Sequence, residues 1–207
     1  MKILSLDLST VCSGWALFES TAPTYEATKL HRYGTIEPLP KLSESERYFC
    51  ITHQVDMLIR LFRPDQLVIE DTFCGKNVTT LKTLNRLAGH VQSVWFRLRQ
   101  RDAAFYMPAQ TRKSVGLSGR AEKPEIVEGV NKFFKLRGKV TDHNAADSIV
   151  LGYHHILTGA FAPAGGVEDP TLDTVETIEP PSPSEFVKPL PKDKKRKKEN
   201  DKQQSGL

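Results

Sequence analysis

The sequence predicts an α/β domain built on a mixed five-stranded sheet with helices on both faces, followed by a tail. Over the first 158 residues, short apolar segments alternate with longer amphipathic ones in the order βββαβαβαα. Near Gly159 the composition changes to Pro, Ser, Thr and charged residues with almost no apolar pattern. A length of 207 residues suits one domain with an extension better than two full domains. We therefore assign residues 1–158 to the domain and residues 159–207 to a disordered tail, first acidic and then basic.

Three strands begin the domain. Residues 2–7 (KILSLD) are a short apolar run that ends on an acid, and residues 14–19 (GWALFE) follow after a turn. Residues 29–36 (KLHRYGTI) give the third strand. Because the connections are short, the three strands are expected to form an antiparallel meander.

A helix, a strand and a second helix come next. Apolar residues at helical spacing predict a helix over residues 43–61, which Pro64 ends. Residues 66–70 (QLVIE) form a strand of the buried type that again ends on an acid. Residues 78–99 alternate apolar and basic positions over about six turns, a pattern typical of a long amphipathic helix.

One strand and two helices complete the domain. Residues 103–107 (AAFYM) are the fifth strand, stopped by Pro108, and helices are expected at about 122–136 and 143–158. A meander that leads into two βα crossovers builds a mixed sheet covered on both sides. This arrangement predicts a ribonuclease H-like fold.

The net charge of +4 hides three segments of different sign. Residues 1–160 carry +5, residues 161–187 carry −6 and residues 188–207 carry +5. Within the first segment, residues 76–139 carry a local charge of +10. Such a basic half favours a polyanionic partner, nucleic acid first, with an ordinary solvated surface as the alternative. The basic end of the tail raises the hypothesis that it adds to DNA affinity.

The sequence predicts an intracellular, cytoplasmic protein with no membrane span. No eighteen apolar residues occur in a run, and Asp7 interrupts the N-terminus before a signal-like stretch develops. The three cysteines, Cys12, Cys50 and Cys74, have neither a CxxC nor a zinc-binding spacing. They are expected to be free thiols in a reducing compartment.

Three acids occupy positions that the predicted fold brings together. Asp7 closes the first strand, Glu70 closes the fourth, and Asp147 lies in the first turns of the last helix. A lone Asp at a strand end is more often a turn or cap residue, but three at compatible positions indicate a site. Clustered carboxylates suit Mg²⁺ or Mn²⁺. Two such ions about 3.5–4 Å apart can activate a water and stabilise the leaving oxygen of a phosphodiester.

The fourth ligand of such a site is open. At about 100° per residue, Asn144 lies about 60° from Asp147 around the helix, and His143 lies about 40° away on the other side. Asp142 is about 140° away and fits better as the N-cap. Geometry therefore favours His143, which can bind Mn²⁺ or act as a general base, or Asn144.

Four segments carry a resemblance to a known family. They are LDLSTVCSGWAL, VIEDTFCGKN, YMPAQTRKSVGLSGRAEK and HNAADSIVLGYHH, in this order over residues 1 to about 157. The chain resembles RuvC, the Holliday-junction resolvase of bacteria, and its phage relatives. The third segment is the specific one, because it combines Tyr-x-Pro, a basic pair, two glycines three apart and Ala-Glu-Lys.

The resemblance implies a homodimeric, metal-dependent endonuclease that makes paired symmetric nicks in a four-way DNA junction, in a bacterial cell or a phage-infected host. Asp7, Glu70 and Asp147 match three of the four family metal ligands. The fourth, an acid or a histidine three residues before the last Asp, is Asn144 here. Either His143 or Asp142 takes over, or three acids and an amide suffice, or the sequence is an inactivated Asp→Asn form.

The resemblance also implies DNA contacts. Phe73 matches an aromatic residue that wedges into the junction, or it is core beneath its loop. Lys113 and Lys123 match basic positions near the scissile phosphate, where they bind phosphate and stabilise developing negative charge. Gly116 and Gly119 permit the turn that brings these lysines inward. The other positions expected to bind DNA are Lys76, Asn77, Arg112 and Arg120.

The helix over residues 78–99 has a second use under this resemblance. Its apolar stripe is wider than one sheet face needs, so it supplies either a two-fold interface or ordinary core packing: Leu81, Leu84, Leu87, Ala88, Val91 and Val94. Two rival functions stay open, a broader nuclease of branched DNA on the same fold and a junction-binding protein that no longer cuts. The sequence does not indicate whether a helicase partner exists.

Overall fold

The computed structural model describes residues 1–72, 78–136 and 139–160. The predicted tail lies outside these residues from position 161 onward. The five strands form one sheet in the order β3-β2-β1-β4-β5. They are β1 (Lys2–Asp7), β2 (Ser13–Ser20), β3 (Thr28–Ile36), β4 (Gln66–Glu70) and β5 (Ala104–Tyr106). The first three strands are antiparallel neighbours, whereas β4 runs parallel to β1 and β5 parallel to β4. The predicted meander and mixed sheet are confirmed.

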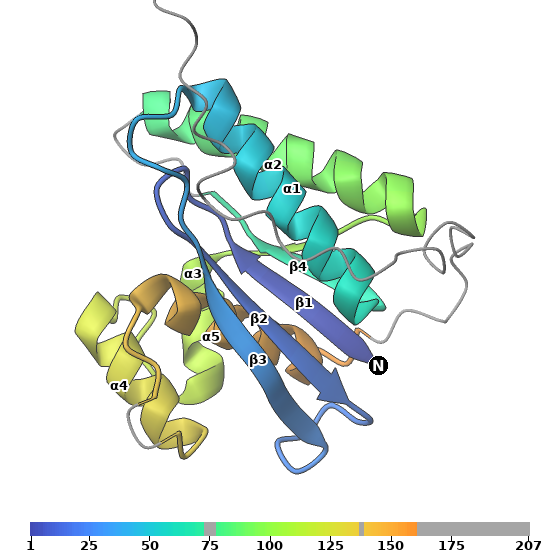
Figure 1. Cartoon of the computed structure of the whole chain (residues 1–207). Helices are drawn as coiled ribbons and strands as arrows, with labels where there is room; N and C mark the ends of the chain where they lie inside the picture. The colour runs from blue at the N-terminus through green and yellow to red at the C-terminus, as the bar shows by residue number, and fades with distance from the viewer. Residues whose placement is uncertain (73–77, 137–138, 161–207) are drawn as a thin grey trace, which may run out of the picture. The chain divides into compact units, whose positions relative to one another are not determined.

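The helices cover both faces of this sheet, as predicted (Figure 1). One face carries α1 (Glu44–Phe62) and α2 (Val78–Arg99). The other carries α4 (Lys123–Phe133) and α5 (His143–Leu157), with two short elements beside them, α3 (Pro108–Thr111) and the 3₁₀ helix η1 (Arg112–Val115).

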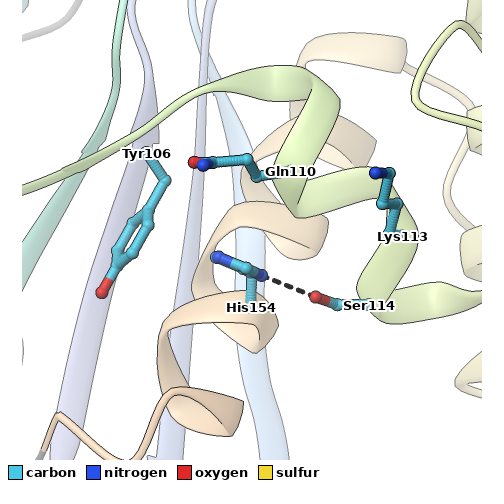
Figure 2. Close-up of a pocket in the computed structure, with 5 residues that line it drawn as sticks. All are labelled: Tyr106, Gln110, Lys113, Ser114 and His154. Atoms are coloured by element: carbon cyan, nitrogen blue, oxygen red, sulfur yellow. Dashed lines mark hydrogen bonds between the residues drawn. The ribbon is translucent and has the colours of Figure 1, made fainter.

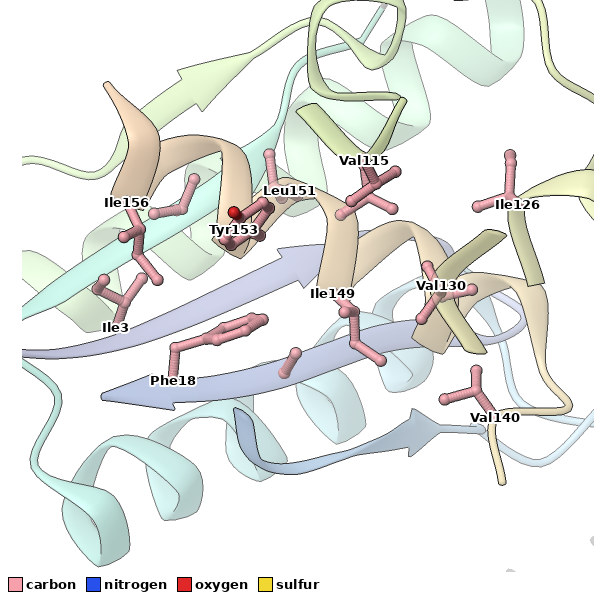
Figure 3. Packing of buried hydrophobic residues seen from close by; sticks show 14 of the residues in the cluster. Ile3, Phe18, Val115, Ile126, Val130, Val140, Ile149, Leu151, Tyr153 and Ile156 are labelled. Carbon is pink, nitrogen blue, oxygen red and sulfur yellow. The ribbon is translucent and has the colours of Figure 1, made fainter. Parts of the chain in front are cut away.

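The alternation of side chains along β1 divides the core into two layers. Leu4 and Leu6 point to the α1/α2 side and pack in one cluster with Ile51 and Val91. Ile3 points to the other side, where it belongs to the cluster that contains α5 (Figure 3). Apolar side chains of both faces are fully buried, so β1 is a central strand covered on both sides.

Helix α5 lies unusually close to the sheet, and small residues allow this. The hydroxyl of Ser5 on β1 donates to the carbonyl of Ser148 at 2.7 Å. A Cβ on Gly152 would lie 2.6 Å from Ser5 Oγ and 2.8 Å from the ring of Phe18. This close approach sets the position of the whole helix, and therefore of Asp147 at its start.

The helix ends have the expected caps. Ser43 and Glu46 form a reciprocal capping box at the start of α1, and Arg63 ends the helix in the left-handed conformation just before Pro64. Asp142 is the N-cap of α5, and its carboxylate accepts from the backbone N–H groups of Asn144 and Ala145.

The segment after β5 differs from the prediction. Strand β5 is shorter than residues 103–107, and Pro108 begins a helix besides ending the strand, since proline is well suited to a first helical position. Gly116 takes a left-handed φ of 76° at the end of η1, which confirms a turn there. Within the described part of the chain, no helix is long and apolar enough to cross a membrane.

Candidate active site

The three predicted acids meet at one edge of the sheet. Leu6 and Ile69 are paired in the parallel ladder between β1 and β4. Asp7 and Glu70 are the next residues on these two strands, so they lie side by side where the strands end. Asp147, in the second turn of α5, lies close enough to raise the pKa of both other carboxyl groups. The expected neighbourhood of the first and fourth strands is confirmed.

Burial and mutual repulsion dominate the electrostatics of this carboxyl cluster, defined as Asp7, Glu70 and Asp147. Burial, followed by repulsion from Asp147, raises the pKa of Asp7 to about 8. Burial, then Asp7 and Asp147, raises the pKa of Glu70 well above its ordinary value. Glu70 Oε2 is buried and has no hydrogen-bond partner among the described residues. Each effect disfavours the ionised form, so the cluster is short of positive charge.

Gly14 brings the start of α5 to this edge. Asp7 is paired with Gly14 in the antiparallel ladder, and a Cβ on Gly14 would lie 1.9 Å from the carbonyl oxygen of Asn144. No side chain fits there without moving α5 away from β2. The absence of a side chain at Gly14 is therefore what allows the helix backbone to reach the level of Asp7.

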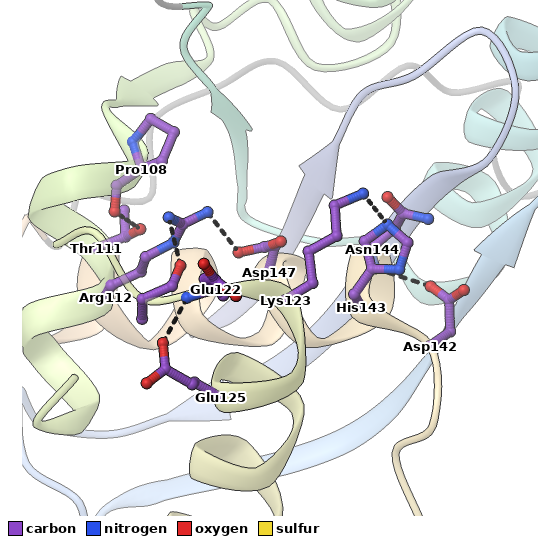
Figure 4. A network of polar contacts seen from close by, with 11 residues as sticks. Pro108, Thr111, Arg112, Glu122, Lys123, Glu125, Asp142, His143, Asn144 and Asp147 are labelled. Carbon is purple, nitrogen blue, oxygen red and sulfur yellow. Dashed lines mark hydrogen bonds and ion pairs between the residues drawn. The ribbon is translucent and has the colours of Figure 1, made fainter. Parts of the chain in front are cut away.

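Two basic side chains, from η1 and α4 on the same face of the sheet as α5, reach the cluster (Figure 4). Arg112 on η1 donates from one terminal nitrogen to Asp147 Oδ1 at 3.4 Å and from the other to the carbonyl of Ala121 at 3.2 Å. Lys123, the first residue of α4, lowers the pKa of Asp7, which places its charge near the cluster. Its Nζ lies 2.6 Å from Nε2 of His143.

The two candidates for a fourth ligand have different surroundings. His143, the first residue of α5, is in contact with Lys123 and lies near Asp147, whose pKa it lowers. The side chain of Asn144 instead interacts with the thiol of Cys12. His143 is thus oriented toward the basic side of the site and Asn144 toward the β1–β2 turn.

The other residues expected to bind DNA are not part of the carboxyl cluster. Lys113 is exposed and lines a neighbouring cavity, so that Arg112 rather than Lys113 is the member of the basic pair beside Asp147. Arg120 is exposed as well. Phe73, Lys76 and Asn77 lie outside the described residues.

The expected stripe on α2 packs mainly inward. Leu87 and Val91 are fully buried in the core on that face. The other members are half-buried: Leu81, Leu84, Ala88 and Val94. The outer side of α2 carries Gly89, which has open space around it, and Phe96, which is 52% exposed.

Sequence reasoning did not single out three residues near this site. They are Cys12 beside Asn144, Tyr106 paired with Glu70 across β4 and β5, and His154 on α5. Tyr106 stands in the Tyr-x-Pro motif, so its position could have drawn attention. Cys12 and His154 carry no comparable signal, because their proximity depends on how α5 packs.

The donor set of the cluster suits a hard divalent cation. Three carboxyl groups supply oxygen ligands, and Glu70 Oε2 is a buried oxygen that accepts no hydrogen bond from any described residue. In the described part of the chain, however, no group of three or more His, Cys, Asp or Glu side chains is close enough to hold one ion. Asp147 is paired with Arg112 in this arrangement.

Comparison with known proteins agrees with this geometry. The family model for the crossover junction endodeoxyribonuclease RuvC matches residues 3–155. The RuvC proteins of Caldicellulosiruptor saccharolyticus and Syntrophomonas wolfei are similar relatives. The first is 26% identical over 160 residues (77% of this chain, 95% of the relative) and the second 28% over 156 residues (75% and 88%).

Solved structures show the same fold. Thermus thermophilus RuvC in complex with a Holliday junction substrate matches with a TM-score of 0.66 at 18% identity, over 81% of this chain and 99% of that one. The yeast mitochondrial Holliday junction resolvase matches with a TM-score of 0.52 at 12% identity, over 76% and 80%. A ribonuclease H-like sheet with Asp7, Glu70 and Asp147 at one edge, matched by the family model over nearly its whole described length, means that this chain belongs to the RuvC family of crossover junction endodeoxyribonucleases.

Proposed function

We propose that this protein resolves four-way DNA junctions by paired symmetric nicks at the carboxyl cluster. The observation that carries the proposal is the convergence of three buried carboxyl groups from β1, β4 and α5, of which Asp147 raises the pKa of both Asp7 and Glu70. Such repulsion lowers the stability of the fold, so its presence indicates a functional site. A pair of hard cations would relieve it. The RuvC complex of Thermus thermophilus contains a Holliday junction substrate, which supports the choice of DNA.

Membership of the family implies dependence on a divalent metal in general terms. For this chain we assign Asp7, Glu70 and Asp147 as ligands of two Mg²⁺ or Mn²⁺ ions, completed by His143 or Asn144. When bound, such ions activate a water and stabilise the leaving oxygen. In-line attack leaves a 5′-phosphate and a 3′-hydroxyl, ends that a ligase can join.

The basic residues around the cluster have two tasks in this proposal. Arg112 and Lys123 lie beside Asp147 and Asp7, where a phosphate would approach, and they stabilise negative charge that develops on it. Arg120, Lys76, Asn77 and Phe73 bind the junction outside the cluster. Lys123 also holds His143 through its Nε2, which fixes the ring at the start of α5.

Paired symmetric nicks require two copies of the chain. We propose a homodimer related by a two-fold axis, with the outer side of α2 as the contact. Phe96 exposes 52% of its surface on that helix and Gly89 leaves room for a close approach. The expected place of action is the cytoplasm of a bacterial cell or a phage-infected host.

The first test is nicking of a labelled four-way junction with Mg²⁺ or Mn²⁺, using the native chain, Asn144→Asp and Asp7→Asn. The expected result is paired nicks by the first two and none by Asp7→Asn. Nicking by the native chain would show that Asn144 does not prevent catalysis. His143→Gln would then test whether His143 is the fourth ligand. If neither the native chain nor Asn144→Asp cuts any branched substrate, the proposed function is wrong.

Two other functions are distinguished by the same assay. Equal cutting of junctions, forks and flaps would indicate a broader branched-DNA nuclease. Binding without cutting, rescued by Asn144→Asp, would indicate a disabled junction-binding protein. The observation that favours the second is the interaction of the Asn144 side chain with Cys12, because an amide there adds no negative charge to the cluster. Removal of residues 160–207 tests the tail: unchanged affinity and salt dependence would exclude its contribution to binding.

A further inference from the structure

A cavity of about 480 Å³ lies next to the carboxyl cluster and has no role in the function derived so far. Figure 2 shows its lining residues on β5, α3, η1 and α5: Tyr106, Gln110, Lys113, Ser114 and His154. None of these five lining residues is acidic. The cavity therefore differs in character from the cluster beside it.

Each wall of the cavity adjoins one part of the cluster. Tyr106 is paired with Glu70 in the ladder between β4 and β5, and both side chains project to the same face of the sheet. Lys113 follows Arg112, which donates to Asp147.

His154 adjoins the cluster along the third wall. It lies seven residues after Asp147, which is two turns along the same face of α5 and about 10 Å along the helix axis. A polymer bound at the cluster and running along this face of α5 would pass over the cavity.

The polar atoms of the cavity include groups that can donate to a ligand. Ser114 Oγ lies 2.6 Å from His154 Nδ1, which fixes the ring and leaves Nε2 as its remaining polar atom. Figure 2 shows that second nitrogen on the side of Gln110 and Tyr106. With the Ser114 hydroxyl as donor to Nδ1, the neutral imidazole carries its proton on Nε2 and donates into the cavity.

The other lining groups fit the same ligand. Lys113 supplies an exposed ammonium group, and the amide of Gln110 supplies N–H donors. The hydroxyl of Tyr106 is turned away, toward His155 Nδ1 at 2.9 Å and Thr158, so the cavity meets its ring. One cation, an amide and an imidazole, with no carboxylate among the five described lining residues, favour an oxygen-rich anion.

We propose that this cavity binds a phosphodiester group of the cleaved strand next to the scissile phosphate, with Lys113 as its cation. The inference rests on the proposed function and assigns a separate place to each basic residue, Arg112 at the scissile phosphate and Lys113 at a flanking one. The separation of about 10 Å between Asp147 and His154 along α5 corresponds to at most about three nucleotides at about 3.4 Å of rise each. The flanking phosphate is therefore one to three nucleotides from the cut.

The test combines neutral phosphates in DNA with a neutral side chain in the protein. Junctions carry a single methylphosphonate at each of the three phosphates on either side of the cut. Affinity is measured without divalent metal for the native chain, for Lys113→Met and for Lys29→Met. Lys29 is an exposed lysine near the start of β3, far from Asp7. Lys113 is exposed, so its replacement does not disturb the core.

The expected result is loss of about tenfold in affinity at one flanking position for the native chain and Lys29→Met. The same methylphosphonate does not lower the affinity of Lys113→Met. The affinity of this variant for the unmodified junction is already lower, and its salt dependence corresponds to about one fewer released ion. An undiminished cost with Lys113→Met, or no sensitive position in the native chain, overturns the proposal. So does a variant that changes base preference instead of phosphate dependence, because the cavity would then hold a base.

Failure of this inference and failure of the proposed function give different results. Binding is measured without cutting, so the phosphate scan is informative even for a chain that does not nick. Conversely, junctions that are cut normally but show no coupling between Lys113 and a flanking phosphate overturn the cavity alone. Gln110→Met gives a second check, since loss of the amide weakens the same position and no other.

Discussion

Lys123 Nζ lies 2.6 Å from Nε2 of His143, so the first residue of α4 contacts the first residue of α5. The same lysine lowers the pKa of Asp7 and of Asp147. The imidazole therefore accepts a hydrogen bond from a cation that also faces the acids. This contact links the fourth-ligand candidate to the basic side of the site.

Replacement of Lys123 by Met should slow nicking by about 100-fold at saturating junction, as expected when one charged donor to a reacting group is lost. Junction affinity should change much less, because many other basic residues bind the DNA backbone. Single-turnover rates and affinities, with Lys29→Met as the matched control, check this. Equal losses in rate and affinity would instead make Lys123 an ordinary backbone contact.

Asp7 should destabilise the metal-free protein. Its pKa is about 8 in the fold against an ordinary value of 3.8, so its favourable contribution to stability is complete below pH 4 and is lost as the pH rises toward 8. Asp7→Asn should therefore be more stable than the native chain at pH 9, by about 2 kcal/mol or more, and inactive. Urea unfolding in EDTA from pH 5 to 9 measures the difference.

Exposed Asp102→Asn is the control for the loss of one negative charge, and its stability should follow the native chain at each pH. Added Mg²⁺ should stabilise the native chain and leave Asp7→Asn nearly unchanged. A difference between the native chain and Asp7→Asn that stays constant from pH 5 to 9 would contradict the burial of an ionisable group at this position.

Gly14 should tolerate no side chain. A Cβ there would lie 1.9 Å from the carbonyl oxygen of Asn144, and this atom belongs to helix backbone that cannot rotate away. Gly14→Ala should lower the free energy of unfolding by roughly 2–3 kcal/mol and abolish metal-dependent nicking, because α5 carries Asp147. Gly89→Ala is the contrast when unfolding is measured at concentrations too low for dimers, since no atom of the same chain surrounds a Cβ on that exposed helical residue. It should stabilise the single chain by about 0.5–1 kcal/mol.

Much of this fold could be predicted from the sequence, because period-two and period-3.6 patterns were clear in the strands and long helices. Strands β1 and β4 and helix α2 have the expected limits. The segment from Pro108 to Val115 was not predicted as helical, since its four-residue elements show no periodicity and depend on packing against α5.

The candidate site was predictable where it depends on topology. Asp7, Glu70 and Asp147 follow from strand ends and one helix start. The sequence did not predict which member of the basic pair faces the acids. Arg112 and Lys113 are adjacent, and only the direction of η1 decides which of them lies beside Asp147. The role of Gly14 also depends on a contact with a residue 130 positions away.

His155 should make the protein sensitive to acid. Burial, followed by the charge of His154, lowers the pKa of His155 to about 4, while its Nδ1 and Nε2 contact the Tyr106 hydroxyl and Gln66 Oε1. Because the folded pKa is below the unfolded one, this contribution to stability is complete above about pH 6.5 and is lost as the pH falls toward 4. The loss should reach roughly 3 kcal/mol.

The slope of stability with pH tests this more sharply than stability itself, since His155→Asn also leaves its two partners without their bonds. We expect His155→Asn to be less stable than the native chain at pH 7 and to lose less stability between pH 6.5 and 4.5. Replacement of the exposed His90 by Asn controls for the removal of a histidine and should keep the native slope. Parallel slopes for the native chain and His155→Asn would mean that another buried group takes up the proton on unfolding.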